Sequence, residues 1–221
     1  MPPSDLWRSI YDSPWHNPGF FWLCGALFFL GLGLKIGGFR GFLVVFGLEI
    51  LADCTLTGGW TPIPPGVAGG TFASVLFVIL GDLRYLFLAE ALRGAGLGRA
   101  ALLRAAGLSL LVPTTAFGFR LLLPAVFSPA RPFFLLYELL FFALALGQSA
   151  AIRPADRDEA RFFRALLAFE LVQYGLWALA DVALLAGFGA GNLLRLLPNA
   201  MYYAFFLPFV AWRAPRAWWR S

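Results

Sequence analysis

Two carboxylates stand inside an apolar segment in the first quarter of the chain. In the stretch LEILADCTLTGGW, which begins at Leu48, Glu49 and Asp53 are four residues apart. That spacing places both on one face of a helix. A charge at the centre of a membrane helix costs about 2.5–3.5 kcal/mol on insertion scales, so such a face needs an ionic partner, a proton or water. The pair is therefore a candidate for substrate binding or proton coupling.

Later apolar segments carry charged residues as well. Their acids are Asp82, Glu138, Glu170 and Asp181, and their basic residues are Arg84, Arg120 and Arg195. Polar and aromatic residues recur every three to four positions in two segments, which places them on one face of each helix. The first stripe is Glu170, Gln173, Tyr174, Trp177 and Asp181. The second stripe is Asn192, Arg195, Asn199 and Tyr202.

The sequence thus predicts a shared polar interior in which acids outnumber arginines. Unpaired acids would be protonated or would face a cation or water. This pattern suits proton coupling or a cationic or polar substrate. The predicted site residues are Glu49, Asp53, Asp82, Glu138, Glu170, Tyr174, Asp181, Arg195, Asn199 and Tyr202.

The composition is that of an integral membrane protein. Of 221 residues, 60% are hydrophobic and 13% are charged, whereas a soluble domain carries about 25% charged residues. The net charge of +5 is spread along the chain, so we expect no nucleic-acid partner. The expected partners are the lipid bilayer, a small-molecule or lipid ligand that the sequence does not name, and further copies of the chain or a larger membrane complex.

Seven apolar segments approach the roughly 20 residues that a helix needs to cross a bilayer. The predicted fold is an all-α polytopic bundle over 18–212, with an extracytoplasmic interfacial arm over 1–17 and a basic, aromatic tail over 213–221. An uncharged, turn-rich loop, GGWTPIPPGVAGG, separates the second and third segments. The seven segments are 18–34, 41–57, 69–89, 102–123, 132–152, 162–186 and 193–212.

Basic residues favour one side of this bundle. With seven crossings, the groups near Lys35, Arg93, Arg153 and Arg213 all fall on one side, and only Arg8 and Arg131 fall on the other. The positive-inside rule then places the C-terminus in the cytoplasm and the N-terminus outside a bacterial-type inner membrane.

Two parts of the chain align with one another. RGFLVVFGLEIL from Arg40 and RFFRALLAFELV from Arg161 superpose these arginines and also Glu49 on Glu170. We interpret this as a parallel duplication of 18–90 and 131–212, with 101–123 as a linker helix. In this layout the chain resembles the SWEET and PQ-loop transporters, which implies solute transport at a site between the repeats. The sequence lacks the Pro-Gln pair of that family, so the resemblance assigns no site residue.

The sequence lacks the residues that several kinds of cofactor or metal site require. A retinal Schiff base needs a lysine within a span, and Lys35 lies at the end of one. His16 is the only histidine, which excludes a bis-histidine haem and leaves zinc without its usual ligands. We predict no cofactor and no metal. Whether Cys24 and Cys54 pair stays open from the sequence, because it depends on geometry.

Three functions remain open from sequence. The favoured one is a small-solute transporter that couples to protons. The second is an intramembrane enzyme that acts on a lipid or isoprenoid, with Asp53 and Asp82 as catalysts. The third is a receptor or structural subunit in which the charges form an ionic network that fixes helix packing.

Overall fold

The computed structural model describes residues 3–32, 38–63 and 68–220, and these residues are helical, with no strand among them. The predicted all-α fold class is thereby confirmed. Lys35, and positions 64–67 of the predicted loop, lie outside the described residues.

The helices follow the predicted apolar segments. The N-terminal arm contains α1 (Pro3–Tyr11) and a π-helical turn, η1 (Trp15–Phe20). The elements that follow are α2 (Phe21–Leu32), α3 (Gly38–Thr57), α4 (Ala68–Glu90), η2 (Ala91–Ala95), α5 (Arg99–Ser109), α6 (Leu111–Leu122), α7 (Pro124–Phe127), α8 (Ala130–Ala151) and α9 (Arg157–Leu185). The last segment is divided into α10 (Gly191–Leu194), α11 (Leu196–Ala200), η3 (Met201–Phe205), α12 (Phe206–Arg213) and η4 (Arg216–Trp219).

Local chemistry explains how α9 begins and why the last segment is broken. The Asp156 side chain accepts the backbone N–H groups of Asp158 and Glu159, which satisfies donors that the first turn of a helix leaves free. Pro198 has no N–H to donate, and the segment around it consists of short α-helical and π-helical turns.

Five helices of the described chain are long and apolar enough to cross a membrane. They span Phe72–Gly94, Arg99–Leu122, Ala130–Ala151, Arg157–Leu185 and Gly191–Arg213. The two remaining predicted spans are weaker for different reasons. Helix α2 has 12 described residues, and α3 has 20 but contains Arg40, Glu49 and Asp53.

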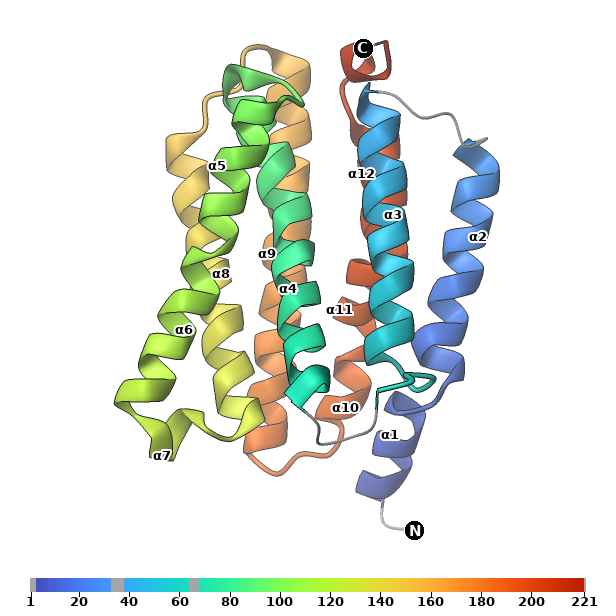
Figure 1. The fold of residues 1–221 in the computed structure, drawn as a ribbon, viewed down its shortest axis with the longest axis vertical. Helices are drawn as coiled ribbons and strands as arrows, with labels where there is room; N and C mark the ends of the chain where they lie inside the picture. The colour runs from blue at the N-terminus through green and yellow to red at the C-terminus, as the bar shows by residue number, and fades with distance from the viewer. Residues whose placement is uncertain (1–2, 33–37, 64–67, 221) are drawn as a thin grey trace.

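Helices α3 to α12 form a closed ring in chain order, and α2 packs outside it. Helix α2 packs on α3, α3 on α4, α4 on α5, α6 on α8, α8 on α9, and α9 on α10 and α11. Helix α12 returns to α3 and closes the ring, while α4 also contacts α9 across its centre. Helix α1 lies at one end of the bundle, and the chain that follows α12 lies at the other (Figure 1).

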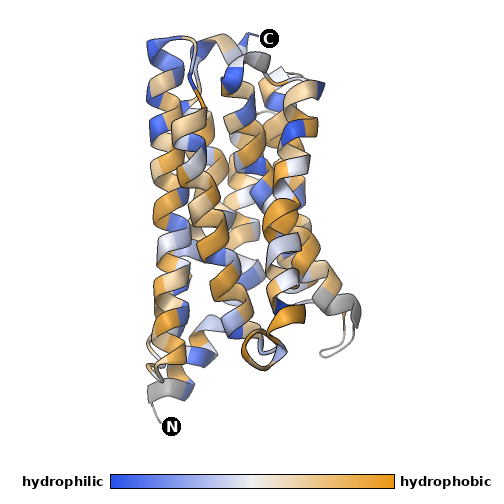
Figure 2. Cartoon of the chain, turned by 90° about the vertical axis from the view of Figure 1, so that its left-hand side faces the viewer, coloured by the Kyte–Doolittle hydropathy of each residue, from blue (hydrophilic) through white to orange (hydrophobic). Residues whose placement is uncertain are grey.

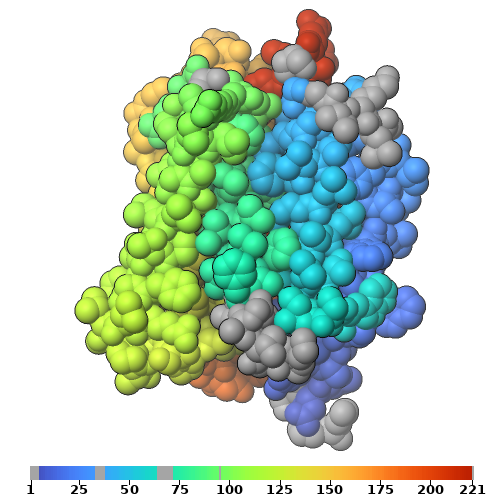
Figure 3. Space-filling view, in the orientation of Figure 1, coloured from blue at the N-terminus to red at the C-terminus, as the bar shows by residue number. Residues whose placement is uncertain are grey.

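Apolar residues cover most of the length of the bundle, and hydrophilic residues gather at the end that holds the C-terminus (Figure 2). In the space-filling view, α3, α4 and α5 lie side by side on one face (Figure 3). Leu23, Leu27 and Leu30 of α2 are exposed, as expected for a helix at the edge of the ring.

Candidate functional site

A cavity of about 390 Å³ lies among α3, α4, α8, α9 and the broken last segment. Its lining from α8 and α9 comes from residues near the N-terminal end of the bundle, around Arg131 and Trp177 (Figure 1). Six of the ten predicted site residues line it, namely Asp53, Glu138, Tyr174, Arg195, Asn199 and Tyr202. The structure brings these six residues together around one cavity.

The cavity also has lining residues that the sequence did not assign to the site. Trp177 shares the helical stripe of Tyr174, so helical phase contains a signal for Trp177. Tyr137 is adjacent to Glu138, and neighbouring residues of a helix do not share a face, so phase gives no signal for it. Tyr11 and Asn17 come from the N-terminal arm, which was predicted only to lie at the interface. Nothing in the sequence pattern indicates that the arm folds against the helix bundle.

Ion pairs form the mouth of the cavity. Asp181 accepts hydrogen bonds from both Arg195 and Arg131, the latter with 3.1 Å between Nη1 and Oδ1. Glu138 Oε1 lies 3.6 Å from Arg195 Nη1. Asp181 is fully buried, whereas the Arg131 side chain is 39% exposed, so the mouth reaches the surface at Arg131.

Arg131 pairs with a buried acid, although the sequence analysis placed it between two apolar segments. It lies in the first turn of α8 and reaches Asp181 on α9. Arg120, which lies within an apolar segment, has its guanidinium 5.6 Å from the centre of the Phe133 ring. Linear position does not show which arginine faces a buried acid.

A second cavity of about 260 Å³ adjoins the first and shares Tyr11, Asn17, Thr57 and Asn199 with it. His16 lines this second cavity, with Nδ1 3.0 Å from the Tyr11 carbonyl oxygen. Burial lowers the pKa of His16, outweighing the opposing effect of that backbone hydrogen bond. The imidazole is therefore neutral at pH 7, with Nδ1 as the donor and Nε2 left as an acceptor.

Tyrosine hydroxyls hold the carboxylate of Asp82. Tyr137 donates to Oδ2 at 2.5 Å and Tyr174 donates to Oδ1. Asp82 is fully buried and lies behind these two rings rather than in the cavity wall. Asp53 is in the wall itself, where Oδ1 accepts the Thr57 hydroxyl at 2.7 Å.

Arg84 is the buried cation next to the cavity. Its Nη1 donates to the Tyr202 carbonyl at 3.1 Å, and its guanidinium lies 4.1 Å from the centre of the Tyr202 ring. Its Nε is 3.6 Å from Glu49 Oε2. Glu170 on α9 is 3% exposed, and the Glu49 side chain is 8% exposed, so both carboxyl groups lie inside the bundle.

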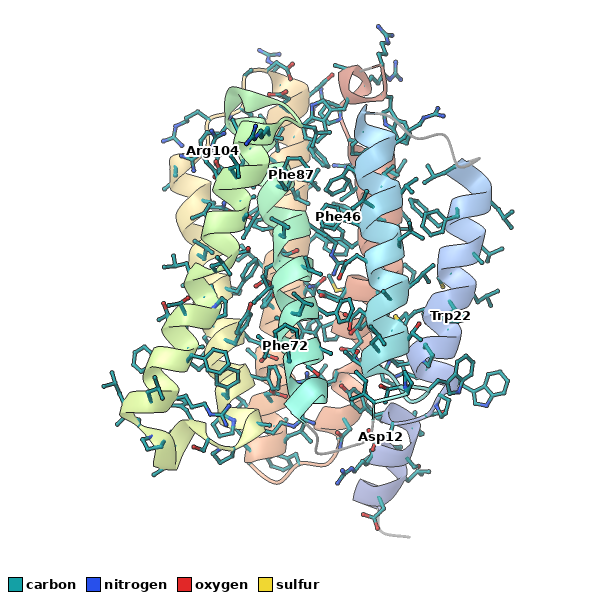
Figure 4. All side chains as sticks on the ribbon, viewed as in Figure 1. Asp12, Trp22, Phe46, Phe72, Phe87 and Arg104 are labelled. Atoms are coloured by element: carbon teal, nitrogen blue, oxygen red, sulfur yellow. The ribbon has the colours of Figure 1, made fainter. Side chains whose placement is uncertain are left out.

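Apolar side chains fill the bundle beyond these charges. Leu88, Leu92, Phe141, Ala145 and Leu166 are fully buried on α4, η2, α8 and α9. Phe46 of α3 and Phe87 of α4 fill the space between their helices in the same half (Figure 4). The cavity therefore has no continuation toward the C-terminal end through these residues.

A third charge cluster lies at the C-terminal end. Glu90 is buried and accepts Arg104 Nε at 2.8 Å, with Arg93 Nε 3.1 Å away. The sequence analysis did not single out Glu90. Among the described residues, no group of three or more His, Cys, Asp or Glu side chains could hold a metal ion, and Cys24 and Cys54 are free thiols.

Comparison of the chain with protein-family models, curated proteins and solved structures finds no match. The function is therefore argued from the site.

Proposed function

We propose that the protein is an integral membrane transporter of a small polar solute and that protons drive uptake. The observation that carries this proposal is the one-ended cavity. It extends from Arg131 at the surface to Asp53 and Tyr202 inside the bundle, and buried apolar side chains close the other half. Transporters place their sites near the midplane and open them to one side at a time.

The transporter would cross the inner membrane seven times, with the N-terminus outside. Helices α2 and α3 would join the five long apolar helices. Opposite chain ends and the basic residues at the C-terminal end support this orientation. The parallel duplication is part of the proposal, supported by the low exposure of Glu49 on α3 and Glu170 on α9, which the alignment superposes.

The site gives less support to the two other functions. An enzyme that used Asp53 and Asp82 together would need both at the substrate, but tyrosine hydroxyls occupy both oxygens of Asp82. A purely structural core would pair its buried polar atoms. Instead Glu138 Oε2, Asp181 Oδ2 and both Glu49 oxygens lack a hydrogen-bond partner among the described residues.

Uptake by proteoliposomes tests the proposal. Purified protein would be reconstituted with an alkaline interior and supplied with radiolabelled phenethylamine, glucose or glutamate, which represent a cation, a neutral polyol and an anion. We expect at least one to accumulate above protein-free liposomes, and a protonophore should abolish the gain. Accumulation of none of the three would overturn the proposal.

Two substitutions test the proton-coupling step. Glu49→Gln and Glu170→Gln keep side-chain shape and remove an ionisable proton. We expect gradient-driven accumulation to fall at least about tenfold while exchange of solute across the membrane persists. Glu159→Gln is the matched control, because Glu159 lies in the first turn of α9, among residues that do not line the cavity. Unchanged accumulation in both variants would contradict proton coupling through these residues.

A further inference from the structure

The unpartnered buried polar atoms of the residues that line the cavities are hydrogen-bond acceptors. Three buried polar atoms of the described residues that line the two adjoining cavities have no partner, and all three are acceptors. They are Glu138 Oε2, Asn17 Oδ1 and His16 Nε2. Glu138 is 5% exposed, so water outside the protein does not solvate its free oxygen. A ligand that completes these atoms must bring N–H or O–H groups.

The charged residues around the cavity are also unbalanced, because acids outnumber arginines. Five buried acids and the half-buried Glu49 surround three arginines, Arg84, Arg131 and Arg195. The buried acids are Asp53, Asp82, Glu138, Glu170 and Asp181. Asp181 holds Arg131 and Arg195 without lining the cavity itself. The carboxylates that do line it are Asp53 and Glu138. A bound cation would offset charge that the arginines leave uncompensated.

Aromatic rings form a continuous band along one wall. The Tyr174 and Trp177 ring centres are 5.3 Å apart, those of Trp177 and Tyr202 5.4 Å, and those of Tyr202 and Tyr203 4.7 Å. Arg84 already lies over the Tyr202 ring at 4.1 Å, so this wall binds a cation in the structure itself. Ring faces attract cations and also pack against apolar groups.

From these three observations we propose that the solute is a small protonated amine that carries N–H donors and an apolar body. The ammonium group would lie between Asp53 and Glu138, and the body would pack on Trp177 and Tyr203. A volume of about 390 Å³ is adequate for such a molecule. This assignment of the substrate class rests on the transporter proposed above.

Four compounds of matched size test the assignment. They are phenethylamine, its N-trimethyl derivative, 2-phenylethanol and 3-phenylpropionate, titrated calorimetrically against the full chain in nanodiscs, with empty nanodiscs as the blank. We expect the amine to bind at least about tenfold more tightly than the alcohol or the acid. The trimethyl compound, which has no N–H, should bind more weakly than the amine. Equal or tighter binding of the alcohol or the acid would overturn the proposal.

Substitutions in the cavity wall test where phenethylamine binds. Asp53→Asn and Glu138→Gln should each weaken phenethylamine binding at least about tenfold, while the matched control Asp158→Asn, at the other end of the bundle, should not. If either acid variant fails to fold, Trp177→Leu removes the aromatic wall without altering charge and should also weaken binding. Unchanged affinity in the folded variants would contradict the site.

Different results would overturn the transporter proposal and the amine-substrate proposal. Transport of glucose or glutamate, with no binding of the amine, would overturn the assignment of the substrate class and leave the transporter standing. Tight binding of phenethylamine, with no uptake by proteoliposomes, would support the amine site and overturn transport.

Discussion

Arg84 is the buried cation that offsets the charge of a carboxylate inside the bundle. It is 1% exposed and lies within reach of Glu49, the Tyr202 carbonyl and the Tyr202 ring. Such a group is costly to bury alone and costly to remove, because its loss leaves the facing carboxylates without a cation. The acids on α3, α4 and α9 therefore depend on one guanidinium.

Removing that guanidinium should destabilise the protein, and removing its partner should reverse part of the loss. We expect Arg84→Leu to cost about 3–5 kcal/mol of unfolding free energy, the usual range for a broken buried ion pair. Glu49→Gln in the Arg84→Leu background should restore about 1–3 kcal/mol, which is the range of coupling between contacting residues. The measurement is a double-mutant cycle by thermal unfolding in nanodiscs. Additive effects of the two substitutions would show that the residues do not interact.

Helical periodicity predicted which side chains turn inward, but not which ones meet. Tyr174, Asn199 and Tyr202, which stand on the three-to-four stripes, line one cavity, because helix geometry alone fixes a shared face. The contact of Arg131 with Asp181 depends on how α8 packs against α9, and a single sequence does not contain that information. The inward fold of the arm around Tyr11 depends on packing in the same way.

At the scale of elements, close packing of α4 against the last segment sets the inner end of the cavity. A Cβ added to Gly81 would lie 1.8 Å from the Tyr202 hydroxyl oxygen, which donates to the Phe77 carbonyl at 3.0 Å. Only glycine allows this approach. Tyr202 is thereby fixed between Arg84 and the cavity.

Gly81→Ala should therefore displace Tyr202 and damage the site. We expect a loss of about 1–3 kcal/mol in stability, typical of overpacking, and weaker binding of phenethylamine. Gly175→Ala on α9 is the matched control, because its added Cβ would meet Phe142 at an ordinary 3.7 Å. Thermal unfolding and calorimetry of both variants make the comparison. Equal behaviour of the two alanine variants would contradict the role given to Gly81.

At the scale of the whole molecule, the half of the bundle that buried apolar side chains fill distinguishes transport from the other proposed functions. A transporter must open this half and close the mouth, whereas a receptor or subunit can keep the apolar packing permanently. Ala145 lies in that half and is fully buried, and Ser74 lies in the cavity wall. Ser9 and Ala155 are exposed at opposite ends of the bundle and report orientation.

Alternating access is tested most directly by single cysteines in a Cys24→Ala/Cys54→Ala background, labelled with a membrane-impermeant maleimide from either face. Ser9→Cys should react only from outside and Ala155→Cys only from the cytoplasm, which establishes the topology. The account predicts that Ser74→Cys reacts from outside and that Ala145→Cys reacts from the cytoplasm, faster when phenethylamine is present. An Ala145→Cys side chain that never reacts, while Ser74→Cys does, would contradict transport.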